Sequence, residues 1–232
     1  MFKHLVVGGL AILLAGCAML SHGYDIEIKK EEQETEYASV YAEIIEFSGL
    51  GNREYQSELN MSIRQEITDA ISAFDALAID ASKALPQGVK STLKITQNVK
   101  RNTDDIISFI TEQYIYMGGA HGNTVWYPKT VYVTDENPHE LTLDELFDDD
   151  GYMEKLNGII NTMVKENSDK YSELWAKPEI TEQNQNRFYI QDDNLVIFFP
   201  PYELAYYAKG FIEFPIPLSD INSILDDNFK VE

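Results

Sequence analysis

The chain has 232 residues, of which 44% are hydrophobic and 12% are aromatic. This is enough to build one large domain or two small ones around a real core. Asp and Glu outnumber Lys and Arg by 39 to 18, and the formal net charge is -21. This balance argues against nucleic-acid binding, because phosphate recognition depends on clustered Lys and Arg. A basic partner would complement the charge, but acidity that only keeps the protein soluble explains it equally well.

The first residues have the organisation of an export signal. Lys3 precedes an apolar run from Leu5 to Leu14, which is too short to span a bilayer. The tetrad that ends in Cys17 (LAGC) is similar to a bacterial lipobox, in which the cysteine thiol is lipidated and the cysteine becomes the new N-terminus. Cys17 is the only cysteine, and its position directly after the apolar run favours lipidation over a place in the core. We predict a lipoprotein signal peptide at 1–16.

Removal of this signal takes away the positive charge of Lys3 and leaves a net charge of -22. Acyl chains on Cys17 would anchor the protein, while repulsion from anionic lipid would hold its body off the membrane surface. Ala18 follows the cysteine. In diderm lipoproteins an aspartate at this position is the usual retention signal, so the resemblance to them implies export to the outer membrane. Residues 17–36 are expected to form a lipidated tether, in which the alternation of Tyr24, Ile26 and Ile28 indicates a short edge strand.

An N-terminal strand-helix half is predicted at 37–88. Alternating apolar residues indicate a strand at 37–47. A long amphipathic helix at 53–84 follows, because apolar residues recur every three or four positions; they are Leu59, Ile63, Ile67, Ala70, Ile71, Phe74 and Leu77. Pro86 and Gly88 would end this helix.

A C-terminal half is predicted at 89–232, and it begins with strands at 89–101, 104–117 and 125–134 that we expect to form an antiparallel meander. The last two are joined by a turn with Gly118, Gly119, His121 and Gly122, whose glycines indicate positive φ angles or close backbone approach. The predicted fold class is α+β, an antiparallel sheet meander packed by one long and one medium amphipathic helix.

The medium helix is predicted at 152–167, with Met153, Leu156, Ile159, Ile160, Met163 and Val164 on its apolar face. Thr142 and Glu145 have capping-box spacing for a short helix before it. The acidic run Asp148–Asp150 lacks the alternating spacing of a calcium loop and suits a helix N-terminus, so we favour no metal there.

Beyond the medium helix, residues 168–186 are expected to be a surface excursion. A hairpin is predicted at 188–190 and 195–199, an aromatic connection at 202–209, a last strand at 210–216 and a short helix capped by Ser219 that runs to Leu225.

The chain offers few residues for catalysis. The four histidines have no i, i+4 pair and no cysteine cluster, and no Gly-x-Ser-x-Gly run is present, so we expect no metal, no cofactor and no catalytic site. His121 is a binding candidate, although a histidine among glycines more often bonds its own loop. Aromatic side chains are the other binding candidates, since Tyr and Trp are enriched at binding hot spots; they are Tyr116, Trp126, Tyr127, Tyr202, Tyr206 and Tyr207. Of these, Tyr202, Tyr206 and Tyr207 are expected to be exposed.

Three segments resemble one family: Tyr116 to Asn123, Leu141 to Phe147 (LTLDELF), and Leu195 to Ala205 (LVIFFPPYELA) continuing to Gly210 and Ile216–Leu218. Together they are similar to the extracellular module of RsiV-like proteins, which also looks similar to the accessory region of PdaC-type peptidoglycan deacetylases. The resemblance implies an α+β module outside the membrane, which senses lysozyme in the anti-sigma members. Tyr206 departs from the proline usual in relatives.

The sequence carries no transmembrane helix, sigma-binding region or deacetylase domain that would match those relatives, so their signalling and catalysis do not transfer. We expect a non-catalytic, lipid-anchored protein of the bacterial cell envelope, placed at the outer membrane if the host is diderm. Its expected partner is a lysozyme-like basic protein or the peptidoglycan glycan. An envelope hydrolase or deacetylase with an unrecognised site and a structural lipoprotein of an envelope complex are the alternatives.

Overall fold

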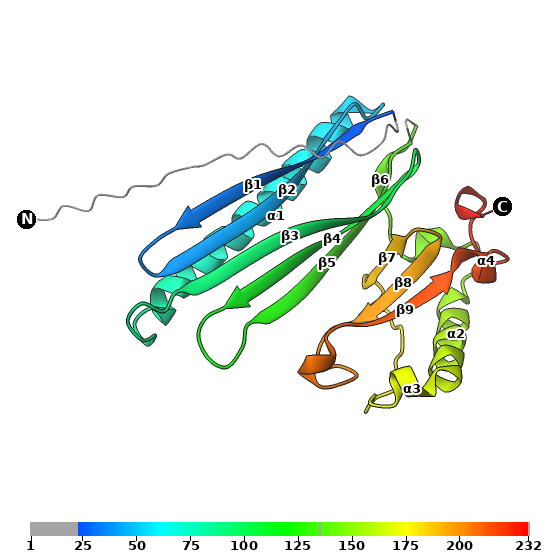
Figure 1. The fold of residues 1–232 in the computed structure, drawn as a ribbon. Helices are drawn as coiled ribbons and strands as arrows, with labels where there is room; N and C mark the ends of the chain where they lie inside the picture. The colour runs from blue at the N-terminus through cyan, green and yellow to red at the C-terminus, as the bar shows by residue number, and fades with distance from the viewer. Residues whose placement is uncertain (1–22, 135, 232) are drawn as a thin grey trace, which may run out of the picture. The chain divides into compact units, whose positions relative to one another are not determined.

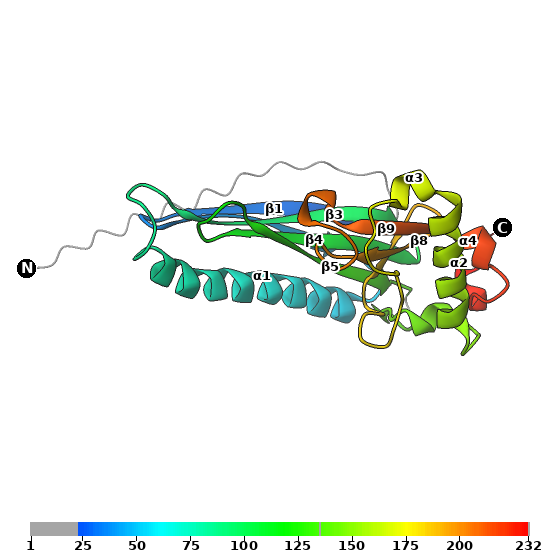
Figure 2. The same ribbon diagram turned by 90° about the horizontal axis from the view of Figure 1, so that it is seen from below.

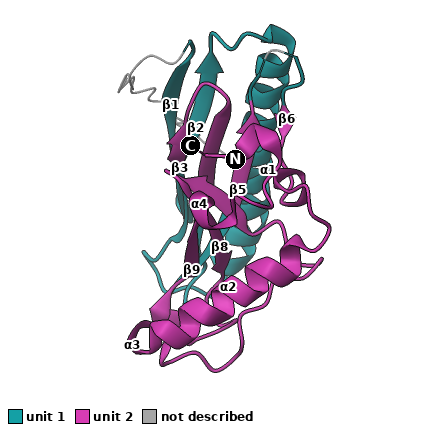
Figure 3. Cartoon of the chain, turned by 90° about the vertical axis from the view of Figure 1, so that its right-hand side faces the viewer, with its two compact units in different colours: residues 1–98, 111–126, 133–138 teal, residues 99–110, 127–132, 139–232 magenta. Residues whose placement is uncertain are grey.

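The computed structural model describes residues 23–134 and 136–231. The predicted signal peptide and Cys17 lie outside the described residues. Within them the chain forms an α+β fold with a six-stranded mixed sheet, a three-stranded sheet and four α-helices (Figure 1). The predicted fold class is therefore confirmed. Two compact units share the chain, one from residues 1–98, 111–126 and 133–138 and the other from 99–110, 127–132 and 139–232 (Figure 3).

The first unit begins with a hairpin of β1 (Asp25–Glu34) and β2 (Ala38–Ser48), which pair antiparallel from Asp25↔Ser48 to Glu34↔Ser39. The Thr35 hydroxyl accepts a hydrogen bond from the Ala38 N–H at 2.9 Å and closes the turn. The predicted edge strand is therefore confirmed, but it is longer than expected and continues through the charged residues to Glu34. The charged side chains of β1 suit an edge strand, because they oppose pairing with other chains.

The helix α1 (Arg53–Ala81) follows β2 and lies on one face of the six-stranded sheet (Figure 2). Its N-cap is Asn52, whose side chain accepts from the Tyr55 N–H at 3.0 Å. Its buried residues are Leu59, Ile63, Ile67, Ile71, Phe74 and Ala78. The predicted helix is confirmed, but Leu77 was wrongly placed on the apolar face: it is 57% exposed, and Ala78 takes the buried position.

The strand after α1 is β3 (Ser91–Asn102). It pairs parallel with β2, because α1 returns the chain to the end of the sheet at which β2 begins. The sheet is therefore mixed and not wholly antiparallel. The strands β4 (Ile106–Tyr116) and β5 (Asn123–Tyr132) then lie next to one another in chain order, as the predicted meander requires, and the short β6 (His139–Glu140) completes the sheet. The sequence predicted a boundary between two halves near residue 88. The two compact units divide elsewhere, because β3, β4 and β5 each begin in one unit and end in the other.

The second unit contains η1 (Asp144–Leu146), α2 (Tyr152–Glu166) and α3 (Ser168–Tyr171), followed by the predicted hairpin of β7 (Phe188–Gln191) and β8 (Asn194–Phe199). The predicted Thr142–Glu145 interaction is present, because the Glu145 carboxylate accepts from the Thr142 N–H at 2.7 Å. The unit ends with η2 (Tyr207–Lys209), β9 (Ile212–Pro217), α4 (Leu218–Ile221) and η3 (Asp227–Phe229).

The core of the second unit forms where α2 meets the sheet β7-β8-β9. Leu156 and Ile160 of α2 are fully buried, as are Phe214 and Ile216 of β9. Ser219 does not cap the last helix, because α4 begins at Leu218 directly after Pro217, whose fixed φ already suits a helix start. None of the helices in the described part of the chain is long and apolar enough to cross a membrane.

Candidate functional site

The glycine-histidine turn between β4 and β5 is shaped by its own packing. Gly118 and Gly119 have φ angles of 94° and 107°, which glycine adopts without strain. A Cβ on Gly122 would lie 2.4 Å from the ring of Tyr114, so this position has room only for glycine. Nδ1 of His121 lies 2.8 Å from the Gly122 carbonyl oxygen. The His121 ring is thus engaged by its own turn, and the arrangement favours a structural role.

The other candidates near this turn also contact their neighbours. The Tyr116 hydroxyl donates to the Gly119 carbonyl at 3.2 Å, and Nε1 of Trp126 donates to the Glu112 carboxylate at 2.7 Å. Tyr127 follows Trp126 on β5, so its side chain points to the opposite face of the strand. It is 52% exposed.

Aromatic side chains of the second unit gather on the connection between β8 and β9, residues 200–211, which we call the tyrosine loop. Tyr202 and Tyr206 are 56% and 41% exposed, as the sequence predicted, whereas Tyr207 is half-buried. The Tyr202 and Tyr207 rings pack at a centroid distance of 5.4 Å. Trp175 is 59% exposed, and its Nε1 donates to the Glu203 carbonyl at 3.2 Å. The loop and the adjoining Trp175 therefore present three large aromatic side chains to solvent.

The backbone under these side chains is held in place. Leu204 and Ala205 are buried, and the Leu204 carbonyl accepts from the Trp175 N–H at 2.9 Å. Glu203 pairs with Arg187 at 2.6 Å across the base of the loop. A fixed loop loses little conformational entropy when it binds a partner, so its exposed rings are preorganised for contact.

Tyr202 has a φ of 70°, a left-handed conformation that is uncommon for a residue with a Cβ. Such strain costs about 1–3 kcal/mol and gathers at binding and active sites. A glycine would adopt this backbone more easily, yet the position carries an exposed tyrosine. This conformation is the strongest local indication that the tyrosine loop is functional.

A polar cluster borders the aromatic rings. The Tyr206 hydroxyl donates to Glu173 at 2.8 Å, and Lys209 forms an ion pair with the same carboxylate. The hydrogen bond from Lys209, followed by that from Tyr206, lowers the pKa of Glu173. At neutral pH the surface thus offers aromatic faces together with one carboxylate and one ammonium, a composition suited to binding a protein or a sugar.

Sequence reasoning missed Trp175 and Glu173, because it treated residues 168–186 as an unspecific surface excursion. A tryptophan in an otherwise polar stretch was the available signal. Among residues 23–134 and 136–231, no group of three or more His, Cys, Asp or Glu side chains is placed to hold a metal ion.

Two family models match the chain. One described as "Deacetylase PdaC" covers residues 31–124, and one described as "Protein of unknown function (DUF3298)" covers residues 144–219. The first contains the end of β1, the elements β2 to β4 and the glycine-histidine turn, and the second contains α2 and the tyrosine loop. Of the three segments that carried the resemblance, Tyr116–Asn123 lies in the first region, and the second region contains residues 144–147 and the segment from Leu195 to Leu218.

Two curated proteins of Bacillus subtilis are similar to this chain. The anti-sigma-V factor RsiV is 26% identical over 212 residues, which span 86% of this chain and 69% of RsiV. The peptidoglycan-N-acetylmuramic acid deacetylase PdaC is 26% identical over 144 residues, or 60% of this chain. That match spans only 30% of PdaC.

Solved structures of two DUF3298 proteins share the fold. The protein from Bacteroides fragilis superposes with a TM-score of 0.67 at 15% identity, covering 88% of this chain and 94% of that one. The protein from Pseudomonas aeruginosa superposes with a TM-score of 0.59 at 14% identity, covering 89% and 96%.

Proposed function

We propose that this chain is a cell-envelope protein that binds a lysozyme-like basic protein through its tyrosine loop. The proposal draws on its similarity to RsiV and on its PdaC-like region, which precedes a DUF3298 region. The observation that carries this proposal is the exposed, preorganised aromatic surface around the strained Tyr202. A net charge of -21 adds attraction for a cationic partner.

Binding of lysozyme to the purified protein tests this function. We expect saturable binding that Tyr202→Ala weakens by about tenfold or more, because central aromatic residues dominate interface energies. Tyr127→Ala is the matched control, since Tyr127 is similarly exposed but lies on β5. No saturable binding at low or moderate salt would remove lysozyme as the partner.

Peptidoglycan is the second candidate, because Trp175, Tyr202 and Tyr206 expose flat faces on which sugars stack. Co-sedimentation with purified insoluble peptidoglycan distinguishes the two ligands. Saturable co-sedimentation that is lost in Trp175→Ala and unaffected by salt would support the glycan over the basic protein.

We also propose that the protein acts by binding and not by catalysis. His121 is the residue that the sequence offers as a general acid or base, and its Nδ1 interacts with the Gly122 carbonyl of its own turn. Incubation with peptidoglycan fragments should therefore release neither acetate nor shortened glycans, as followed by mass spectrometry. Turnover that depends on His121 would favour the hydrolase or deacetylase alternative.

Lipid anchoring at Cys17 completes the proposal and rests on the sequence alone. Mass spectrometry of the protein from bacterial membranes should find a diacylated N-terminal cysteine. Cys17→Ala should leave the signal peptide uncleaved by the lipoprotein peptidase and remove the acyl mass. An unlipidated cytosolic protein would contradict this anchor.

A further inference from the structure

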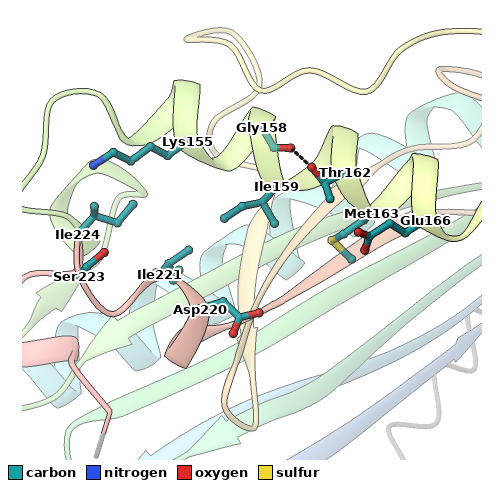
Figure 4. Close-up of a pocket in the computed structure, with 10 residues that line it drawn as sticks. All are labelled: Lys155, Gly158, Ile159, Thr162, Met163, Glu166, Asp220, Ile221, Ser223 and Ile224. Carbon is teal, nitrogen blue, oxygen red and sulfur yellow. Dashed lines mark hydrogen bonds between the residues drawn. The ribbon is translucent and has the colours of Figure 1, made fainter.

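A groove of about 650 Å3 runs along α2 in the second unit, between this helix and the segment Asp220–Ile224 (Figure 4). Its apolar lining comes from Ile159 and Met163 on the helix and from Ile221 and Ile224 opposite them. The volume lies within the range of about 300–1,000 Å3 typical of ligand sites. None of its lining residues belongs to the tyrosine loop, so it is a separate surface.

Gly158 opens the groove to the backbone of α2. A glycine inside a helix costs about 0.5–1 kcal/mol relative to alanine. A Cβ built on Gly158 meets no atom within 4 Å, so the described chain gives no steric reason for the missing side chain. The Thr162 hydroxyl donates to the Gly158 carbonyl at 3.0 Å (Figure 4). The space above Gly158 is therefore open to an external chain.

The charges of the groove are unbalanced. Lys155 lies at one end and already pairs with Asp149, with 2.5 Å between Nζ and Oδ2. Glu166 on α2 and Asp220 on the opposite segment also line the groove, away from Lys155 (Figure 4). In the described part of the chain neither carboxylate has an ion pair or a hydrogen bond from another side chain. The groove thus combines an apolar floor with two uncompensated negative charges.

We propose that this groove binds a short aliphatic peptide segment that carries a lysine or an arginine at one end. The aliphatic side chains would cover the partly exposed Ile159 and Met163, the peptide backbone would pass over Gly158, and the cationic group would sit between Glu166 and Asp220. Such a ligand matches both the apolar lining and the sign of the charge. The proposal does not depend on the function of the tyrosine loop.

The test uses the purified protein and a fluorescein-labelled peptide of leucine, alanine, leucine and lysine amide, followed by fluorescence anisotropy. A peptide with glutamate in place of lysine measures the contribution of charge, and one with serine in place of both leucines measures that of apolar contact. The lysine peptide should bind most tightly. Converting both acids, Glu166→Gln with Asp220→Asn, should weaken it about fivefold, as expected for exposed ion pairs.

Gly158→Leu is the decisive variant, because a Cβ at this groove-lining position meets no neighbouring atom and leucine favours the helix more than glycine does. It should retain or raise the Tm while weakening binding by about tenfold or more. Gly158→Ala is the matched control, which should bind within about twofold of the original protein. No saturable binding of the lysine peptide, or binding that Gly158→Leu leaves unchanged, overturns the proposal.

Discussion

Glycines of the turn between β4 and β5 are required for two different physical reasons. Gly119 has a φ of 107° but no neighbour near the place of a Cβ, whereas Gly122 has no positive φ but packs under the Tyr114 ring. The sequence predicted that these glycines supply unusual angles or close approach. It could not assign one reason to each position, because the second depends on where Tyr114 lies.

These two reasons can be separated by mutation. Gly119→Ala should destabilise by about 1–2 kcal/mol through backbone strain alone. Gly122→Ala should cost about 1–3 kcal/mol through overpacking. Repeating both in a Tyr114→Ala background should abolish the cost of the second change and preserve that of the first. Urea unfolding measures the free-energy cost of each glycine substitution with and without the Tyr114 ring. If loss of the ring changed both costs equally, the assignment would be contradicted.

Tyr202 allows stability and binding to be separated at one residue. Tyr202→Gly removes the left-handed strain, so its free energy of unfolding should stay within about 1 kcal/mol of the original or rise. Tyr202→Val places a β-branched side chain at the same φ and should lose about 1–2 kcal/mol. Urea unfolding tests this order. Both variants should lose lysozyme binding, since both lack the ring, and retained binding would exclude the side chain from the interface.

The exposure of Tyr202 and Tyr206 could be predicted from the sequence, because a proline pair and a glycine bound a loop that holds them. The inclusion of Trp175 could not. It joins this surface through hydrogen bonds to Leu204 and Glu203, about thirty residues away, which periodicity and turn rules do not address.

At the scale of the elements, α1 depends on a narrow buried stripe. Ile67 is 2% exposed at its centre, so Ile67→Ala should lower the free energy of unfolding by about 2–5 kcal/mol. Leu77→Ala is the matched control, because the exposed Leu77 should change stability by less than about 0.5 kcal/mol. Equal losses in thermal or urea unfolding would contradict the observed face of the helix.

The edge strand β1 is tied to its neighbours by charge. Lys29 on β1 pairs with Glu46 on β2 at 2.5 Å, and Arg64 of α1 contacts both Glu46 and Glu31. The hydrogen bond from Lys29 lowers the pKa of Glu46 below its ordinary value of 4.5. A lowered folded-state pKa means that this stabilisation is complete above pH 4.5 and is lost as the pH falls through the folded value.

Glu46→Gln should therefore lower stability at pH 7 by about 0.2–1 kcal/mol, the usual range for partly exposed pairs. At pH 3 the difference from the original protein should shrink towards zero. Urea unfolding at the two pH values measures this difference, with the exposed Glu58→Gln on α1 as a control. A loss that is equal at both pH values would exclude the ion pair as its cause.

Patterns within single segments predicted most helices and strands, but not the way in which they pair. The alternation in 37–47 and 89–101 indicates two strands, whereas their parallel pairing follows from the crossover by α1. The alternation of Tyr24, Ile26 and Ile28 indicates only a short strand, and its continuation through the charged residues to Glu34 depends on pairing with β2. Local sequence is silent on both points because they depend on long-range neighbours.

At the scale of the whole molecule, the net charge of -21 would attract a cationic partner over a long range. Long-range electrostatic attraction mainly raises the association rate constant of two proteins, whereas aromatic contacts in the interface mainly lower the dissociation rate constant. The two contributions to the proposed binding of a basic partner should therefore appear in different rate constants.

Stopped-flow or biosensor kinetics with lysozyme can resolve them. Raising NaCl from about 20 mM to about 150 mM shortens the Debye length from roughly 20 Å to about 8 Å, so the association rate constant should fall by about tenfold. The dissociation rate constant should change much less. Tyr202→Ala should show the reverse, a faster dissociation with the same dependence of association on salt. An association rate that is insensitive to salt would mean that the acidity of this protein serves no cationic partner.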